Sequence, residues 1–344
     1  MSADIDADRI QERDVSMKTG KLPENVLKRS VLKQIKTKRE EVLIGAGIGE
    51  DCAVFSFSEN GLIAVTVDPV TWTGEKAARF AVHGCVNDLA SSGAEPVAVI
   101  VSALLPENIE EADIRAMTAQ IEEECAALHI QAAGGHTEIT EAVNRPVITV
   151  AGIGRIAGNR AVSVKNIKPG QDIVASKWIG LEGTAILASA REQELLGRYP
   201  VRLIEEAKGF DKLLSVIPEA ATAVKSGVCA MHDVTEGGIF GALWEMAEGA
   251  GVGLEIDLKR IPVRQETIEL CEFFEINPYE LVSGGCLLMA ADNGYDLVRA
   301  LEKESIPAAV IGKTTDGNDR VVINEDERRF LEPPKADELH KVIH

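Results

Sequence analysis

Asn87 and Asp88 stand side by side in the segment Ala81-Val-His-Gly-Cys-Val-Asn-Asp-Leu-Ala-Ser-Ser-Gly-Ala94, which is otherwise apolar. A helix that faces a core carries such a pair only where its polar groups have partners. His83 precedes Asn87 by one helical turn and shares its face. As a lone histidine, His83 fits a hydrogen-bonded core residue better than a metal ligand. The pair itself indicates a site.

Three further acids occupy similar settings. Asp51 follows a glycine-rich segment that contains Gly47 and Gly49, Asp68 follows an apolar run, and Asp233 follows another. Glycines let backbone N–H groups approach phosphate, although no P-loop signature follows here and an ordinary turn is the alternative. A turn cap is the alternative role for Asp68. Carboxylates at the ends of buried elements are what a divalent metal bound to phosphates requires.

Two glycine pairs flank further polar residues. Ala133-Gly-Gly-His-Thr-Glu138 predicts a turn from which His136, Thr137 and Glu138 project, with a helix C-cap as the alternative. Met231-His-Asp-Val-Thr-Glu-Gly-Gly238 predicts a strand, an N-cap at Thr235 and a helix whose N-terminus favours an anion.

The composition limits the class of protein. A net charge of −19 argues against nucleic acid as a partner, while nucleotides remain compatible through Mg²⁺. The 6 cysteines are scattered without a C-x-x-C pair, which is typical of reduced thiols in the cytoplasm. No apolar run reaches the length of a membrane helix, and the acidic N-terminus does not resemble a secretory signal. We therefore expect a soluble, cytoplasmic protein with no membrane partner.

The pattern of apolar residues divides the 344 residues into two mixed domains. We expect an α+β fold in which helices cover one face of each sheet. The expected segments are a disordered extension (1–16), a basic arm or helix (17–41), an N-terminal domain (42–156), a C-terminal domain (168–325) and a tail (326–344).

The motifs together resemble ATP-dependent proteins related to aminoimidazole ribonucleotide synthase. That group includes thiamine-monophosphate kinases, selenophosphate synthetases and formylglycinamidine synthases. The strongest likeness is to the hydrogenase-maturation carbamoyl dehydratase branch. The likeness covers about residues 18–325 and rests on the order of the glycine turn with its acid, Asp68, Val86-Asn-Asp-Leu-Ala90, Gly134-Gly-His-Thr137 and His232-Asp-Val-Thr-Glu-Gly-Gly238.

The resemblance implies two related α+β domains. The N-terminal sheet would dimerise across the ATP site, and the C-terminal α/β sandwich would cover that site. The implied metal ligands are Asp51, Asp68 and Asp88, which would hold Mg²⁺ on the phosphates of ATP. The implied nucleotide-binding residues are Gly47, Gly49, Asn87, Gly134, Gly135, Thr137 and Asp233.

Two departures from the family pattern bear on function. His136 stands where many relatives have an acid, and imidazole is a poor ligand for Mg²⁺. The maturation dehydratases act on a C-terminal cysteine, whereas the last cysteine here is Cys286.

We therefore hold two hypotheses. The first is an ATP-dependent enzyme, with Asp88 and His136 as catalytic residues, that transfers phosphate to an oxygen of an unknown acceptor in a hydrogenase-maturation-like process. The acceptor is a small molecule or is carried on a protein. The second is a non-catalytic ATP-binding accessory or regulatory protein.

Overall fold

The computed structural model describes residues 24, 28, 42–44, 47–50, 52–58, 61–71, 74, 76–158 and 160–343. The expected extension at 1–16, nearly all of the basic arm at 17–41, and Asp51 lie outside the described residues. The two described residues of the arm, Glu24 and Lys28, form an ion pair, and Lys28 also reaches Glu248 of the C-terminal domain, at 2.5 Å between Nζ and Oε1.

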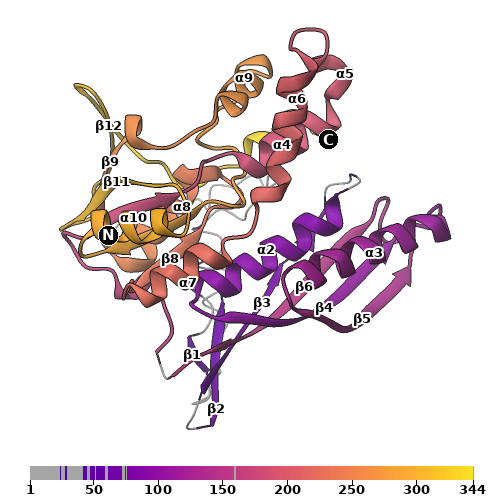
Figure 1. The fold of residues 1–344 in the computed structure, drawn as a ribbon, viewed down its shortest axis with the longest axis horizontal. Coiled ribbons are helices and arrows are strands. Elements are labelled where there is room, and N and C mark those ends of the chain that lie inside the picture. The colour runs from indigo at the N-terminus through magenta and orange to yellow at the C-terminus, as the bar shows by residue number, and fades with distance from the viewer. Residues whose placement is uncertain are drawn as a thin grey trace, which may run out of the picture.

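The N-terminal domain is one sheet with helices on a single face (Figure 1). Its strand order is β1-β2-β3-β6-β4-β5, antiparallel except for the parallel pair β4–β5. Apolar residues of α2 and α3, such as Val82, Val86 and Ile121, pack with Val99 and Val150 of the sheet. The elements are β1 (Val42–Ile44), β2 (Ala53–Ser58), β3 (Gly61–Val70), α2 (Ala77–Ser91), β4 (Glu95–Leu105), α3 (Glu111–Ala127), β5 (Gln131–Ile139) and β6 (Val147–Ile156).

Asp68 lies inside a strand. Strand β3 continues to Val70, and Asp68 pairs in register with Val150 of β6. The strand tolerates Pro69 because the register of β2 along β3 runs only from Gly61 to Val65, so this stretch of β3 is paired on one side alone. Asp68 is therefore not the strand-terminal residue that the turn-capping alternative assumes.

The segment predicted as a turn around Gly134 is strand β5. It continues the crossover from β4 through α3 and pairs with β4 in parallel. A Cβ on Gly135 would lie 1.9 Å from the carbonyl oxygen of Val101, so the second glycine allows the two strands to approach. The glycine pair indicated unusual backbone geometry, but it serves a close strand contact in place of a turn.

The C-terminal domain holds a sheet of order β13-β12-β9-β11-β7-β10-β8, antiparallel except for the parallel pair β12–β9. Its strands are β7 (Asp172–Ser176), β8 (Ala230–Asp233), β9 (Gly253–Asp257), β10 (Leu287–Ala291), β11 (Ala308–Thr315), β12 (Arg320–Asn324) and β13 (Glu327–Phe330). Its helices are α4 (Leu181–Ala190), α5 (Glu192–Leu195), α6 (Val201–Lys208), α7 (Ile217–Lys225), α8 (Gly238–Ala250), α9 (Gln265–Phe273) and α10 (Gly294–Lys303), with short 3-10 turns η3 (Val164–Asn166), η4 (Gly209–Leu213), η5 (Leu258–Arg260) and η6 (Glu338–Lys341).

Helices cover both faces of this second sheet, which differs from the one-sided cover expected. Ile173 of β7 packs toward α8, whereas its neighbour Val174 packs with α7 and α10. The central strands β7 and β10 are almost wholly buried, because a strand covered on both faces is apolar along its whole length. The α+β fold in two domains is confirmed, with a three-layer second domain.

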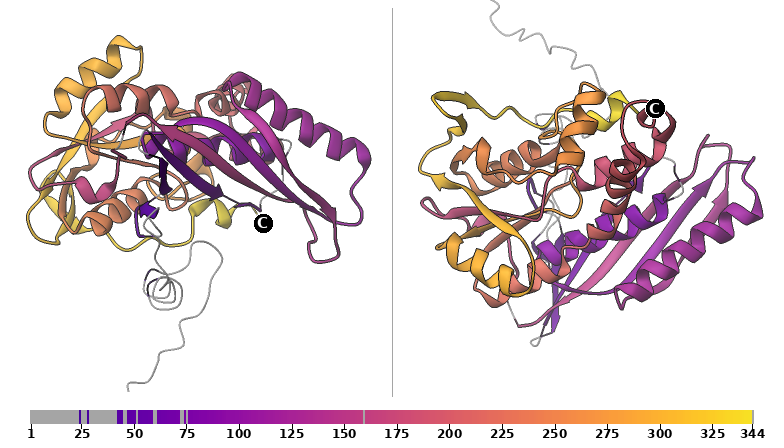
Figure 2. Two further views of the ribbon diagram at one scale, coloured as in Figure 1. Left: turned by 90° about the horizontal axis from the view of Figure 1, so that it is seen from below. Right: turned by 45° about the horizontal axis from the view of Figure 1, so that its top comes forward.

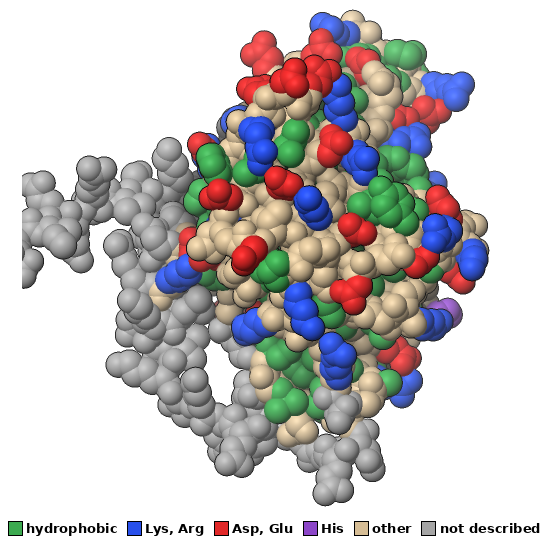
Figure 3. Space-filling model, turned by 90° about the vertical axis from the view of Figure 1, so that its left-hand side faces the viewer, with side chains coloured by type: hydrophobic (Ala, Val, Ile, Leu, Met, Phe, Trp, Pro, Cys, Tyr) green, Lys and Arg blue, Asp and Glu red, His purple; other side chains and the backbone are tan. Residues whose placement is uncertain are grey.

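The two domains meet along α2, which lies against β8 and α7 of the C-terminal domain. Seen from below, the strands of the N-terminal sheet lie in front, and no described helix covers them (Figure 2). The outer side of the C-terminal domain mixes acidic and basic side chains without a large patch of one sign (Figure 3). Among the described residues, no helix is long and apolar enough to cross a membrane.

Candidate functional site

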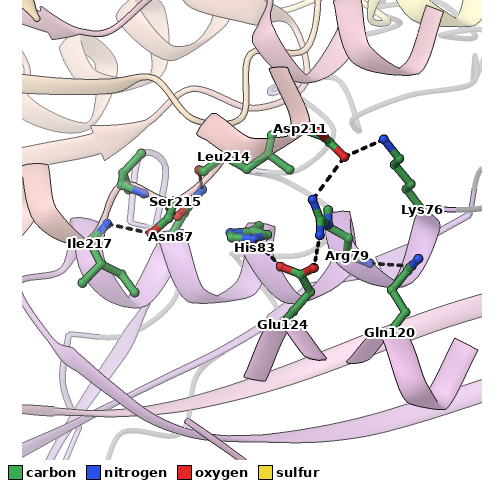
Figure 4. A network of polar contacts seen from close by, with 11 residues as sticks. Lys76, Arg79, His83, Asn87, Gln120, Glu124, Asp211, Leu214, Ser215 and Ile217 are labelled. Atoms are coloured by element: carbon green, nitrogen blue, oxygen red, sulfur yellow. Dashed lines mark hydrogen bonds and ion pairs between the residues drawn. The ribbon is translucent and has the colours of Figure 1, made fainter. Parts of the chain in front are cut away.

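Helix α2 presents two polar faces, which explains the adjacent Asn87 and Asp88. Arg79, His83 and Asn87 follow one another at intervals of four residues and face the 211–217 segment of the C-terminal domain (Figure 4). Gly84 and Asp88, also four residues apart, face β3. Each member of the pair therefore serves a different neighbour.

Asp88 and Asp68 come together where α2 crosses β3. The Thr66 hydroxyl donates a 2.6 Å hydrogen bond to Oδ2 of Asp88. Oδ2 of Asp68 lies 3.1 Å from the position that a Cβ on Gly84 would occupy, one turn before Asp88. Burial raises the pKa of the Cys85 thiol, and the nearby charges of Asp88 and Asp68 raise it further. The structure thus brings two of the three predicted metal ligands to one stretch of α2.

Asn87 reaches into the other domain. Its Nδ2 donates to the carbonyl oxygen of Leu214 at 2.8 Å, and its Oδ1 accepts from the N–H of Val216 at 3.0 Å. The residue is only 1% exposed. Both ends of the amide therefore have backbone partners across the domain boundary, while its predicted nucleotide contact stays a prediction.

A charged network extends the same contact (Figure 4). Asp211 Oδ2 accepts from Arg79 at 3.1 Å and from Lys76 at 2.6 Å, and Arg79 also pairs with Glu124 at 2.6 Å. His83 Nε2 lies 3.0 Å from Glu124, as expected for a hydrogen-bonded core histidine. Burial alone would raise the pKa of Glu124, but the hydrogen bond from His83 and the charge of Arg79 lower it overall.

Glu182, in the first turn of α4, was missed by the sequence analysis. Its carboxylate accepts a hydrogen bond from the N–H of Gly284, and Oε2 would lie only 2.1 Å from a Cβ on that glycine. Burial raises the pKa of Glu182 to about 8, and the charges of Asp337 and Asp68 contribute. The charges of Asp68 and Glu182 therefore interact across the domain boundary. The glycine pair Gly284-Gly285 before an apolar strand was the available signal.

The predicted glycine loop at Gly47 and Gly49 contacts the C-terminal domain. Gly49 has φ +69°, and a Cβ there would lie 2.8 Å from the Glu245 carbonyl oxygen of α8. Glu50 beside it accepts from Ser163 at 2.8 Å and pairs with Lys165 at 3.0 Å. Gly49 is required by its backbone conformation and by the domain contact, and the role of both glycines toward phosphate stays a prediction.

The residues Gly134, Gly135, His136 and Thr137 lie on β5, the exposed edge strand. Asp68, Val150, Val101 and Gly135 form one row across four neighbouring strands. Three strand spacings separate Asp68 from Gly135 by about 14 Å. His136 is exposed and lies 3.5 Å from Glu138. The edge strand and Asp68 therefore stay apart within one chain.

Asp233 ends β8, the strand beside α2, and is buried at 2% exposure. The following helix starts later than expected, because its N-cap is Gly237 at φ +83° and Thr235 does not cap it. Gly237 N–H donates to Asp337 of the chain's own C-terminal segment at 2.8 Å. The anion expected at this helix N-terminus is thus a carboxylate of the same chain.

The donor types suit Mg²⁺, which prefers carboxylate oxygens. Among the described residues, no group of three or more His, Cys, Asp or Glu side chains is placed to hold a metal ion. Asp68 and Asp88 supply two carboxylates, and the third predicted ligand, Asp51, lies outside the described residues. These residues fit the ion chemically as part of a ligand set completed by phosphate and water.

Two family models match this chain consecutively: the N-terminal domain of AIR synthase related proteins at residues 49–156 and their C-terminal domain at residues 168–324. The chain belongs to the AIR synthase related protein family. A putative hydrogenase expression/formation protein of Methanocaldococcus jannaschii is 28% identical over 94% of this chain and 97% of its own. A carbamoyl dehydratase HypE of Rhodobacter capsulatus is 29% identical over 72% of this chain and 70% of its own.

Solved structures share the fold. A HypE–HypF complex superposes with a TM-score of 0.73 at 23% identity, over 90% of this chain and 99% of the matched chain. HypE in complex with ATP gives 0.67 at 18% identity, over 92% and 96%. AaThiL complexed with AMPPCP and TMP gives 0.72 at 19% identity, over 94% and 99%.

Proposed function

We propose that this protein is an ATP-dependent enzyme that transfers the γ-phosphoryl group of ATP to an oxygen of an acceptor. The observation that carries the proposal is the convergence of Asp68, Thr66 and Asp88 at the crossing of β3 and α2. Phosphoryl transfer depends mainly on positioning and charge neutralisation, and two half-buried carboxylates, one of them held by a hydroxyl, suit a metal–phosphate contact.

Relatives support ATP as the nucleotide. One structure of this fold is HypE with ATP, and another is AaThiL with the ATP analogue AMPPCP. Similar sequences are named carbamoyl dehydratase HypE, which supports a hydrogenase-maturation-like process. The HypE–HypF complex also supports a protein partner.

Asp68 and Asp88, together with Asp51, would hold Mg²⁺ on the phosphates. When bound, the ion would neutralise phosphate charge during transfer. Thr66 fixes the orientation of Asp88, and Gly84 leaves room for Asp68. Glu182 of the second domain, whose charge interacts with that of Asp68, would contact an acceptor held between the domains.

The remaining predicted residues keep their proposed roles toward ATP. Gly47 and Gly49 would approach the phosphates, and Asp233 would approach from the second domain. Gly134, Gly135 and Thr137 would contact the nucleotide from β5, and His136 would shuttle a proton.

A homodimer would bring β5 to a neighbouring site. The face of the N-terminal sheet opposite α2 exposes a row formed by Val67 (64% exposed), Ala151 and Ile100 (44% exposed). Ile63 lies four residues before Val67 on the same face of β3. An apolar sheet face of this kind favours association with a second copy. Because β5 lies about 14 Å from Asp68 in one chain, its nucleotide contacts would serve a different part of ATP or the partner's site.

A non-catalytic ATP-binding accessory protein is the second candidate. It is favoured by the exposed His136, which stands on β5 in place of an acid. Phosphate release from Mg-ATP, measured across a panel of amide, carboxylate and phosphate-ester acceptors, separates the candidates. We expect acceptor-stimulated release that Asp88→Asn abolishes. ATP binding without release under any condition would favour the accessory protein.

A further inference from the structure

We propose that Asn87 is a positioning residue: by fixing the turn at 213–216 of the C-terminal domain, it sets the position of the Glu182 carboxylate. This inference rests on the proposed function, because it assigns catalytic importance to Glu182. Its structural part, the clamp on the turn, stands independently.

Asn87 holds the turn from the N-terminal domain. Its side-chain amide donates to the carbonyl oxygen of Leu214 and accepts from the N–H of Val216, so it binds the backbone on both sides of Ser215. Leu214 and Val216 are themselves 1% and 0% exposed. A buried backbone carbonyl and N–H that lost these partners would be left unsatisfied, which makes the contact costly to break.

The same turn is held from the opposite side by Lys177. Its Nζ donates to the carbonyl oxygens of Leu213 at 2.8 Å and Ser215 at 2.7 Å and pairs with Glu219 at 2.7 Å. Lys177 is 8% exposed and belongs to the C-terminal domain. The turn is therefore clamped between one residue of each domain.

The 213–216 turn also supports Gly284 and Gly285, the glycine pair that contacts Glu182. A Cβ on Gly285 would lie 2.6 Å from the carbonyl oxygen of Leu213, so the glycine pair packs directly on the turn. The adjacent Gly284 donates its N–H to the Glu182 carboxylate. A shift of the turn would consequently move the donor that orients Glu182.

These contacts connect the candidate site to Glu182. Asn87 is adjacent in sequence to Asp88, which is bound to Thr66 beside Asp68. From Asn87 the contacts pass through the turn, Gly285 and Gly284 to Glu182, whose charge interacts with that of Asp68. Helix α2 thus carries Asp88, a predicted metal ligand. One residue earlier it carries Asn87, which binds the backbone of the C-terminal domain.

The experiment compares Asn87→Ala with Lys177→Met, which loosens the same turn without altering the N-terminal domain. Asn166→Ala is the matched control, since Asn166 donates to Cys229 within the C-terminal domain. For each full-length variant we would measure the ATP dissociation constant, kcat for Mg-ATP hydrolysis, Tm, and hydrogen exchange of the peptide covering 211–219.

We expect kcat to fall roughly 10-fold or more in both turn variants, because a small displacement of a positioned group slows the reaction. ATP affinity should stay nearly unchanged. Exchange at 211–219 should accelerate in both, and Asn166→Ala should match the wild type. If Asn87→Ala weakens ATP binding while Lys177→Met does not, Asn87 contacts nucleotide directly and the inference is wrong.

Unchanged exchange in both variants would also overturn it. If Asn87→Ala does not fold, Lys177→Met decides alone by the same readouts. A wild type that neither binds nor hydrolyses ATP would refute the proposed function, and the exchange measurement would still decide whether the clamp exists.

Discussion

The hydroxyl of Thr66 donates a 2.6 Å hydrogen bond to the carboxylate of Asp88 and so ties α2 to β3 beside Asp68. Thr66 is 7% exposed, and a hydrogen bond to a charged group in such a place is stronger than a neutral one. Asp88 is therefore tolerated in the middle of an apolar helix, because its carboxylate has a fixed hydrogen-bond partner on β3.

Replacing Thr66 by Val should therefore misorient Asp88 while preserving shape. We expect kcat for Mg-ATP hydrolysis to fall roughly 10-fold, and the free energy of unfolding to drop by about 1.5–3 kcal/mol. Thr66→Ser keeps the hydroxyl and serves as the control. Equal kinetics in the two variants would show that the hydroxyl does not position Asp88.

Glu182 should make stability depend on pH. Its pKa is raised from an ordinary 4.5 to about 8, so the folded state holds a proton that the unfolded state releases. Stability is then full below 4.5 and falls as the pH rises to about 8. Glu182→Gln removes this dependence, and its Tm should exceed that of the wild type at pH 8.5 but not at pH 4.5.

Thermal melts across this range test the expectation. Glu123→Gln, an exposed change on α3, is the control and should follow the wild type. A constant difference between Glu182→Gln and the wild type at every pH would show that Glu182 does not titrate in this window.

The two glycines of β5 offer a matched pair. Both have a similar backbone, with φ +156° at Gly134 and +159° at Gly135, yet a Cβ meets nothing within 4 Å at Gly134 and lies 1.9 Å from Val101 oxygen at Gly135. Gly135→Ala should cost about 1–3 kcal/mol more than Gly134→Ala in denaturant unfolding, because β5 must shift. Equal losses of unfolding free energy in the two variants would show that backbone conformation alone, and not the approach of Val101, requires the glycines.

The two cations on Asp211 should contribute unequally. Arg79 also binds Glu124 and so links both domains, whereas Lys76 is more exposed and binds Asp211 alone among the contacts described. In urea unfolding, Arg79→Met should cost about 1–3 kcal/mol, and Lys76→Met about 0.5 kcal/mol or less. A larger loss for Lys76→Met would contradict the bridging role of Arg79.

Local patterns in the sequence predicted the two mixed α+β domains and the apolar helix that carries Asn87 and Asp88. The spacing of residues along α2 is a short-range signal, since the side-chain period follows directly from backbone geometry. The exception at Gly134 is instructive, because glycines favour a turn locally and only the approach of Val101 from a distant strand makes them part of β5. That information is tertiary and is absent from the segment itself.

The site was predictable in part for the same reason. Asp88 and Asp68 were visible as acids in apolar surroundings, and the structure brings them together. Glu182 and Asp337 were missed because each looks like an ordinary acid near a helix or tail until the domains are assembled. The role of Asn87 toward Val216 likewise depends on a contact between residues 129 positions apart.

The most direct test of the central claim is a calorimetric titration of the full-length protein with ATP and Mg²⁺, comparing the wild type with Asp68→Asn and Asp88→Asn. Asp296→Asn, on the exposed start of α10, is the control. We predict Mg²⁺-dependent ATP binding by the wild type and the control, weakened by roughly 10-fold or more in each site variant, as lost charge-assisted contacts to a metal–phosphate imply. Equal affinity in all four proteins, or no ATP binding by the wild type, would contradict the account.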